Sequence, residues 1–159
     1  MISFRKHSGI FTLETRQELS ISIEKAWDFF SSPKNLVKIT PEHMEFKITS
    51  GDLTKMYEGQ MITYSVGLLP GVRSSWVTEI THVDEPNMFV DEQRFGPYSM
   101  WHHEHTFESL DNGGVLMKDK VSYKIPFGPL GILVEKLIIR NQLRNIFTYR
   151  ENTLNQLFN

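Results

Sequence analysis

The hydrophobic positions of the C-terminal stretch, Pro129 to Phe158, have the spacing of a long helix. No proline follows Pro129 within this stretch, and no glycine follows Gly131. One apolar face runs along its whole length: Ile132, Ile139, Leu143, Ile146, Phe147, Leu154 and Leu157. A second apolar face is confined to the part before Asn141: Leu130, Leu133, Val134, Leu137 and Ile138. The pattern predicts a helix that lies on a sheet. The second flank of its first half needs either a neighbouring element or subunit, or a place in the wall of a pocket.

Most of the preceding chain alternates between apolar and polar residues, which predicts half-buried strands. The alternating segments are residues 10–20, 46–48, 60–66, 73–83, 88–95, 99–110 and 115–125. Asp111-Asn-Gly-Gly114 is a hairpin signal, and Asp84-Glu-Pro-Asn87 is a second turn. Helical spacing returns only in residues 22–30, with Ser22 as the expected N-cap, and in residues 35–39.

This order of elements predicts an α+β fold. A curved antiparallel sheet of about seven strands would wrap around the long C-terminal helix, with two short helices after the first strand. Residues 1–159 are expected to form a single domain. A strongly bent sheet closed by a helix leaves a hollow between the two layers, which is where pockets form.

Composition and charge exclude several classes of partner and chemistry. The net charge is −2 and no basic stripe stands out, which argues against nucleic acid. The chain has no cysteine, so disulfides and thiolate chemistry are excluded. No apolar run reaches the roughly 20 residues that span a membrane, and the N-terminus lacks a signal-peptide core. We therefore expect a soluble, cytoplasmic protein that does not insert into membranes.

Several motifs carry a resemblance to a known group of proteins. They are Trp27-Asp-Phe-Phe30, Gly96-Pro97-Tyr98, Trp101-x-His103-x-His105-x-Phe107, Asp119-x-Val121-x-Tyr123 and Pro126-Phe-Gly-Pro-Leu-Gly131. With them the chain resembles the START-like (SRPBCC) superfamily, which includes polyketide cyclases and birch-allergen-like proteins, and it looks closest to small bacterial ligand-binding members. The resemblance implies a helix-grip fold and lipid-, polyketide- or hormone-like ligands. It does not select a function, because this superfamily hosts carriers, cyclases, hydrolases and sensors.

The densest polar chemistry lies in the segment Trp101 to Phe107. Alternation places Trp101, His103, His105 and Phe107 on the inner face, whereas His102, Glu104 and Thr106 point outward. The hairpin register then pairs Phe107 with Met117, His105 with Asp119, His103 with Val121, and Trp101 with Tyr123. Counting through the turn at 84–87 sets Val83 opposite Met88, Thr78 beside Gln93 and Trp76 beside Phe95. Asp91, Gln93 and Thr78 would join the histidines in an inner polar band. Arg150 falls on the sheet-facing stripe of the last helix, where a structural salt bridge is expected.

Three interpretations of this band remain open. The first is a network whose buried polar groups satisfy one another and hold the fold. The second is a ligand pocket in which polar anchors orient a mostly apolar molecule. The third is metal or acid–base chemistry that uses His103, His105 and Asp119, either as a two-histidine, one-carboxylate set or as a general base. Because His-x-His alone is a weak signal, we predict no metal and no cofactor.

The function that we expect from the sequence is binding of a small apolar or amphipathic molecule between the sheet and the C-terminal helix. The predicted walls are Tyr64, Trp76, Phe95, Trp101, Tyr123, Leu133 and Leu137, and the predicted polar anchors are Gln93, His103 and His105. One alternative is a cyclase- or hydrolase-type enzyme that uses His103, His105 and Asp119. The other is a protein-interaction module, including a homodimer, in which a partner buries the flank formed by Leu130, Leu133 and Leu137.

Overall fold

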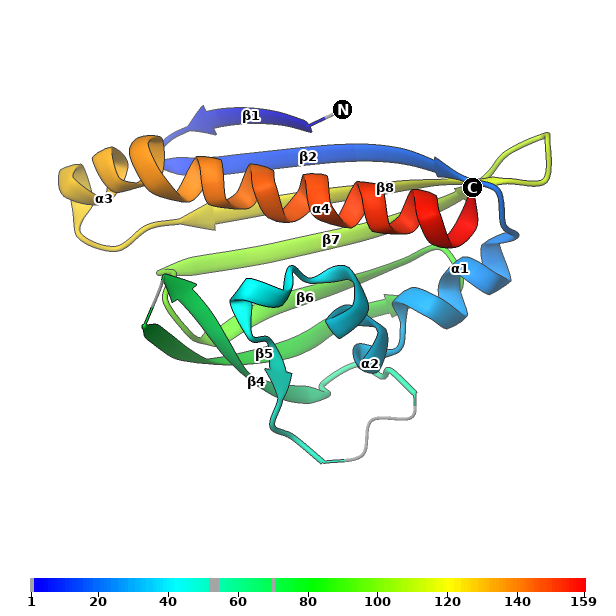
Figure 1. Cartoon of the computed structure of the whole chain (residues 1–159), viewed down its shortest axis with the longest axis horizontal. Helices are drawn as coiled ribbons and strands as arrows, with labels where there is room; N and C mark the ends of the chain where they lie inside the picture. The colour runs from blue at the N-terminus through cyan, green and yellow to red at the C-terminus, as the bar shows by residue number, and fades with distance from the viewer. Residues whose placement is uncertain (1, 52–54, 70) are drawn as a thin grey trace.

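The chain folds into one antiparallel sheet and a long C-terminal helix (Figure 1). A computed structural model describes residues 2–51, 55–69 and 71–159. The strands are β1 (Ile2–His7), β2 (Ile10–Leu19), β3 (Lys47–Ile48), β4 (Met61–Leu69), β5 (Val72–Asp84), β6 (Met88–Phe95), β7 (Met100–Ser109) and β8 (Val115–Lys124). They are ordered β1-β2-β8-β7-β6-β5-β4-β3 across the sheet. The α+β helix-grip prediction is confirmed.

The sheet contains eight strands rather than about seven, because β1 pairs with β2 at one edge. Only Ile2 and Phe4 alternate in this strand before the polar run Arg5-Lys6-His7, so its pattern is too short to stand out in the sequence. A tight turn at Ser8 and Gly9, both with positive φ, joins the two strands. Such a turn matches the twist of a hairpin, and glycine adopts its second position without a steric penalty.

Two short helical segments follow β2, as predicted. Helix α1 (Ile23–Phe30) is capped by Ser22, whose side chain accepts a hydrogen bond from the Lys25 backbone N–H. Helix α2 (Pro33–Leu36) continues into the 3-10 turns η1 (Val37–Ile39) and η2 (Glu42–Met44). In Figure 1 this run of helices lies over the half of the sheet that contains β4, β5 and β6.

The C-terminal helix runs from Gly128 to Phe158 through α3 (Gly128–Val134), the π-helical turn η3 (Glu135–Ile139) and α4 (Arg140–Phe158). It lies along β2 and β8 in Figure 1. On its predicted sheet-facing stripe, Leu143, Phe147 and Leu154 are buried. No helix among residues 2–51, 55–69 and 71–159 is both long and apolar enough to cross a membrane.

The buried apolar side chains form two clusters, one beneath α1 and one beneath the start of α4. One packs beneath α1, where Trp27 makes edge-on contacts with Phe89 and Phe107. The other packs beneath the start of α4 and includes Leu13 and Val121. Burial of these apolar side chains stabilises the fold by about 25 cal/mol per Å2 of apolar surface removed from water.

The register of the β7–β8 hairpin is the predicted one. Its pairs include His105 with Asp119, His103 with Val121, and Trp101 with Tyr123. In the β5–β6 hairpin, Thr78 lies opposite Gln93 as predicted, but irregularities on both sides shift the ends of the ladder. Phe95 therefore pairs with Val77 rather than with Trp76, and Met88 pairs with Asp84 rather than with Val83. A shift of one residue turns a side chain to the other face of the sheet.

Candidate functional site

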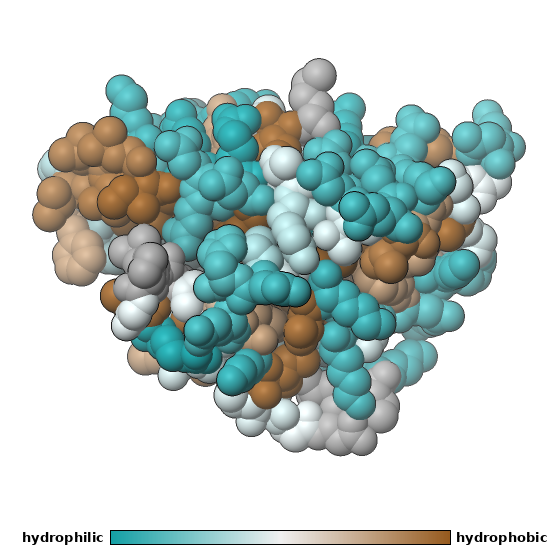
Figure 2. All heavy atoms as spheres, in the orientation of Figure 1, coloured by the Kyte–Doolittle hydropathy of each residue, from teal (hydrophilic) through white to brown (hydrophobic). Residues whose placement is uncertain are grey.

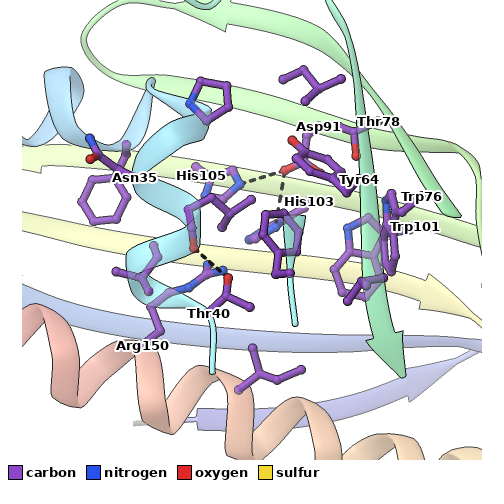
Figure 3. Close-up of a pocket in the computed structure, with 18 of the residues that line it drawn as sticks. Asn35, Thr40, Tyr64, Trp76, Thr78, Asp91, Trp101, His103, His105 and Arg150 are labelled. Carbon is purple, nitrogen blue, oxygen red and sulfur yellow. Dashed lines mark hydrogen bonds and ion pairs between the residues drawn. The ribbon is translucent and has the colours of Figure 1, made fainter. Parts of the chain in front are cut away.

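A cavity of about 180 Å3 lies between the inner face of the sheet, the α1–η2 segment and α4. Its walls are mainly apolar and come from every one of these elements. Leu36 belongs to α2, Ile62 to β4, Phe89 to β6, and Leu143 to α4. Figure 3 shows side chains from the sheet and from α4 converging on this space. The arrangement has the character of a ligand site, in which apolar walls surround a few polar groups.

Tyr64, Trp76, Trp101, His103 and His105 of the predicted binding residues line this cavity. Tyr64 and both histidines are buried, and the two tryptophan rings contact each other edge-on with centroids 5.2 Å apart. Burial is the main reason that the pKa of the Tyr64 hydroxyl is raised, and the charge of Asp91 raises it further. The Tyr64 hydroxyl therefore faces the cavity in its protonated form. Whether these residues bind a ligand remains a prediction.

The prediction that Phe95, Leu133 and Leu137 form walls of the cavity is corrected by the structure, in which their side chains are largely exposed. Phe95 is 64% exposed, since the irregularity between Val77 and Thr78 turns it to the outer face of the sheet. Leu133 and Leu137 are 52% and 62% exposed. Both belong to the first part of the C-terminal helix, whereas the helical residues that reach the cavity begin at Gln142.

The remaining two predicted residues are buried or half-buried but do not line the cavity. Gln93 donates a hydrogen bond to the Tyr98 carbonyl at 2.7 Å and accepts one from the Tyr98 N–H at 3.2 Å. It packs so closely on Gly96 that a Cβ there would lie 2.4 Å from Gln93 Oε1. Gln93 therefore holds the β6–β7 turn. Tyr123 lies beneath the helix and donates its hydroxyl hydrogen bond to Glu135 Oε1 at 2.9 Å.

The polar wall of the cavity is a row of four side chains across β6, β7 and β8. His103 Nε2 and His105 Nδ1 each lie 3.0 Å from Asp119 Oδ1. On the other side, His105 Nε2 lies 2.9 Å and His103 Nδ1 3.5 Å from Asp91 Oδ2. Asp91 and both histidines line the cavity (Figure 3), whereas Asp119 is not among the lining residues and contacts the opposite nitrogens of the two rings. The two imidazoles are thus held between two carboxylates.

Burial and hydrogen bonding act in opposite directions on the charges of this row. Burial raises the pKa of Asp119, but hydrogen bonds from both histidines outweigh it and hold the pKa well below its ordinary value. Burial also raises the pKa of Asp91, but the hydrogen bond with His105 and the charges of His103, His105 and Arg150 together outweigh it, so this pKa is lowered. Burial and the charge on His105 lower the pKa of His103. For His105, burial lowers the pKa but hydrogen bonds to Asp119 and Asp91 outweigh it, so the pKa is raised. Of the two rings, His105 therefore keeps its second proton to a higher pH than His103 does.

Arg150 reaches the cavity from α4 and is 8% exposed. Its guanidinium packs over the Phe147 ring, 4.8 Å from the centroid, and Nη1 lies 3.8 Å from Asp119 Oδ1. The salt bridge expected from the helical stripe is confirmed. Sequence reasoning missed that the Arg150 Nε–H is buried and has no hydrogen-bond partner within the described part of the chain. A buried donor without a partner costs about 1–3 kcal/mol, and Arg150 is a residue that lines the cavity.

Two further features of the site were absent from the predicted set. Asp91 was placed in the inner polar band but was not chosen as a site residue, because the sequence does not show how close it comes to both histidines. Thr40 also lines the cavity, and its hydroxyl donates to the Leu36 carbonyl at 2.7 Å. It comes from a segment between short helical turns, where no periodic pattern marks an inward residue.

The second flank of the C-terminal helix faces outward. Phe127, Leu130, Leu133 and Leu137 are all exposed, and apolar side chains gather at the α3 end of the molecule in Figure 2. Neither a helix nor a loop of the described chain covers these four residues. A protein partner or a second copy of the chain at this face remains a prediction.

No protein-family model matches the chain, and no curated protein matches it in sequence. Solved structures do match. Protein Ms6760 from Mycobacterium smegmatis is 18% identical, with a TM-score of 0.66 over 100% of this chain and 98% of that one. A START superfamily protein from the same organism is 15% identical, with a TM-score of 0.67 over 92% and 98% of the two chains. The birch-allergen-like protein Ara h 8.0201 is 17% identical, with a TM-score of 0.61 over 93% and 99%. The chain therefore has the helix-grip fold of START-like and birch-allergen-like proteins.

Proposed function

We propose that the protein binds a small, largely apolar molecule with an anionic end in the cavity between the sheet, the α1–η2 segment and α4. The observation that carries this proposal is Arg150, a buried cation that lines the mainly apolar cavity and whose Nε–H has no hydrogen-bond partner in the described part of the chain. Apolar walls supply affinity through burial, and a few convergent polar groups fix the orientation of the ligand.

The volume limits the size of the ligand. An engineered protein cavity of about 150 Å3 accepts benzene, whereas drug-sized ligands occupy about 300–1,000 Å3. At about 180 Å3, this cavity fits a molecule built on one substituted ring. Trp76, Trp101 and Tyr98 contact one another along the wall, with ring centroids 4.8–5.5 Å apart, and would pack against such a ring.

The unpaired donor of Arg150 favours an acidic end on the ligand. Arg150 lines the cavity beside His103, His105 and Asp91, and its buried Nε–H has no hydrogen-bond partner in the described part of the chain. A carboxylate that accepts the Arg150 Nε–H would satisfy the buried donor. A hydrogen bond to a charged group contributes about 1.5–3 kcal/mol.

One observation keeps an acid–base enzyme as the second candidate function. His105 is hydrogen-bonded on both ring nitrogens by carboxylates and lines the cavity, so it could pass a proton to a bound molecule. Such a ring, oriented by a carboxylate, is a common general base or acid. A binding protein would release its ligand unchanged, whereas an enzyme would release a product, so recovery of the bound molecule separates the two functions.

Filling the cavity is expected to abolish ligand binding. Thr78 is buried on β5 and points into the cavity, so Thr78→Phe would occupy space that the ligand needs. The matched control is Thr106→Phe on the outer face of β7. With 4-tert-butylbenzoate as the probe, isothermal titration calorimetry should detect binding to the wild type and to the control but not to Thr78→Phe. Equal binding to all three proteins would contradict the proposed cavity, and thermal melts would show that the variants fold.

Removing the cationic group should affect acidic ligands selectively. Arg150→Met keeps most of the side-chain volume but lacks the guanidinium. We expect it to weaken binding of 4-tert-butylbenzoate by about 10–150-fold, the equivalent of one hydrogen bond to a charged group. Binding of the neutral 4-tert-butylbenzamide should change little, because it loses no charged contact. Equal losses for the two molecules would mean that Arg150 shapes the cavity but does not recognise charge.

A further inference from the structure

We infer that Asp91, His103 and His105 form a binding site for one divalent transition-metal ion, such as Zn2+ or Fe2+, on the polar wall of the cavity. The inference deepens the proposed function, because an ion held there would present its open coordination positions to the ligand. The sequence alone predicted no metal, and the alternative that it left open used Asp119 as the carboxylate ligand. The structure gives that role to Asp91.

Three donor atoms of the right kind converge at one point. One atom from each of Asp91, His103 and His105 lies within 4.8 Å of the others. Asp91 Oδ2 is 2.9 Å from His105 Nε2 and 3.5 Å from His103 Nδ1. Ions such as Zn2+ hold imidazole nitrogen and carboxylate oxygen at about 2.0–2.2 Å, so neighbouring donors lie about 3–3.5 Å apart. Two imidazoles and one carboxylate with open positions are a set that Zn2+ and non-haem Fe2+ use.

Asp119 supplies what a metal-binding histidine pair needs on its far side. With an ion bound between Asp91 and the imidazoles, Asp119 Oδ1 would accept the N–H of His103 Nε2 and that of His105 Nδ1, because a carboxylate only accepts hydrogen bonds. The lone pairs of His103 Nδ1 and His105 Nε2 would then point toward the ion beside Asp91. Carboxylates in this position behind a metal-ligating histidine fix its tautomer and raise its basicity. Thr15 donates a hydrogen bond to the other Asp119 oxygen at 3.2 Å and holds the carboxylate in place.

The histidine nitrogens that face Asp91 favour a bound cation. With both histidine N–H groups committed to Asp119, a neutral ring would turn its lone pair against the Asp91 carboxylate at 2.9 Å. A second proton on His105 removes this repulsion in the metal-free protein, but it serves one ring only. A metal ion bound by all three donors removes it for both rings and offsets the charge of Asp91.

The position of the ion determines the chemistry of its ligand. Asp91, His103 and His105 all line the cavity, so the unfilled coordination positions face the apolar space. An oxygen donor on the ligand, such as a carboxylate, a phenolate or an enolate, would bind the ion. Arg150 lines the same cavity, and its Nε–H could donate a hydrogen bond to a second oxygen.

Metal titration without any organic ligand tests this inference directly. We expect calorimetry with ZnCl2 to show one ion per chain, and CoCl2 to give a visible absorption band. Asp91→Asn, which keeps the shape of the side chain, and His103→Ala should each weaken Zn2+ binding by at least about 100-fold, because each removes a ligand. Asp119→Asn should weaken it by about 10–100-fold, as expected for a carboxylate behind the ligands.

The control is His102→Ala on the opposite face of the same strand. His102 is paired with Glu92 and lies 3.6 Å from Glu104, so it is the obvious place for an adventitious surface ion. His102→Ala should bind Zn2+ like the wild type. Nitrogen-15 spectra of the wild type should show shifts at His103 Nδ1 and His105 Nε2 on addition of Zn2+, which does not depend on any variant folding.

Two results would overturn the inference: no Zn2+ binding to the wild type, or binding that survives in Asp91→Asn and is lost in His102→Ala. Its failure is separable from failure of the proposed function. A protein that binds 4-tert-butylbenzoate but no Zn2+ would leave the ligand cavity standing without the metal. A protein that binds Zn2+ at these histidines but none of the organic probes would do the reverse.

Discussion

Asp119→Asn is expected to lower the free energy of unfolding by about 3–5 kcal/mol, the usual cost of removing one partner from a buried ion pair. Asp119 is 2% exposed and contacts four polar side chains: His103, His105, Arg150 and Thr15. Asparagine has the same shape, but it lacks the charge and turns an N–H2 group toward donors. The buried Arg150 cation and the histidine N–H groups would then lose the carboxylate that compensates them. Urea denaturation of the metal-free protein measures the difference.

The same substitution should remove part of the acid sensitivity of the protein. The folded-state pKa of Asp119 is held well below its ordinary value, after its hydrogen bonds outweigh burial. A carboxyl with a lowered folded pKa contributes stability that is present above its unfolded pKa of about 3.9 and is lost as the pH falls through its folded pKa. The stability difference between wild type and Asp119→Asn should therefore be largest near neutral pH and shrink below about pH 4.

The control for Asp119 is Glu104→Gln. Glu104 lies on the outer face of β7 and pairs with Lys120 at 2.8 Å, in a position open to solvent. Exposed ion pairs contribute about 0–1 kcal/mol, so this variant should be nearly as stable as the wild type. If Asp119→Asn were as mild as Glu104→Gln, the buried row would not be stabilising the sheet.

Glu135→Ala is expected to have the second large effect on stability, about 3 kcal/mol, at the lower end of the range for buried pairs. Glu135 is 1% exposed and sits in the π-helical turn between α3 and α4. It accepts hydrogen bonds from Tyr123 Oη at 2.9 Å and from Arg140 Nε and Nη2, both at 3.1 Å. Arg140 is one-third exposed, so water can solvate it after the substitution, which limits the loss.

Hydrogen exchange would locate the effect of Glu135→Ala. Because Glu135 ties the first part of the C-terminal helix to β8, amides in Gly128–Ile139 should lose protection more than those at the end of α4. Glu108→Ala provides the control, since Glu108 is exposed and pairs with Lys118 on the surface. Uniform loss of protection along the whole helix would contradict a local role for Glu135.

The sequence correctly predicted the direction and pairing of the histidines in the polar wall of the cavity. Strict alternation from Trp101 to Phe107 and the short loop at Asp111–Gly114 were enough to place His103 and His105 inward and to pair His105 with Asp119. Both signals are local: side-chain direction alternates within one strand, and a tight hairpin leaves few registers that keep both apolar faces together. The long C-terminal helix and the strands from residue 10 onward followed from periodicity in the same way.

Predictions failed where irregular geometry intervened. Phe95 has the same parity in the sequence as the inward residues Asp91 and Gln93, yet one irregularity in the ladder turned it outward. Such irregularities accompany the bending and twisting of the whole sheet, and the alternation pattern of two strands does not reveal them. Leu133 and Leu137 have the pattern of a buried flank, but whether another element reaches them depends on where the helix begins relative to the sheet.

The sequence by itself determined the periodic elements, the hairpin register and the inward direction of the histidines, because each depends on residues close together in the chain. Only the tertiary structure decided which groups meet at the cavity. It brought Asp91 of β6 against both imidazoles, placed Asp119 on their other side and left the Arg150 Nε–H buried without a hydrogen-bond partner in the described part of the chain. These contacts join residues far apart in sequence, and their distances follow from how the helix packs across the curved sheet.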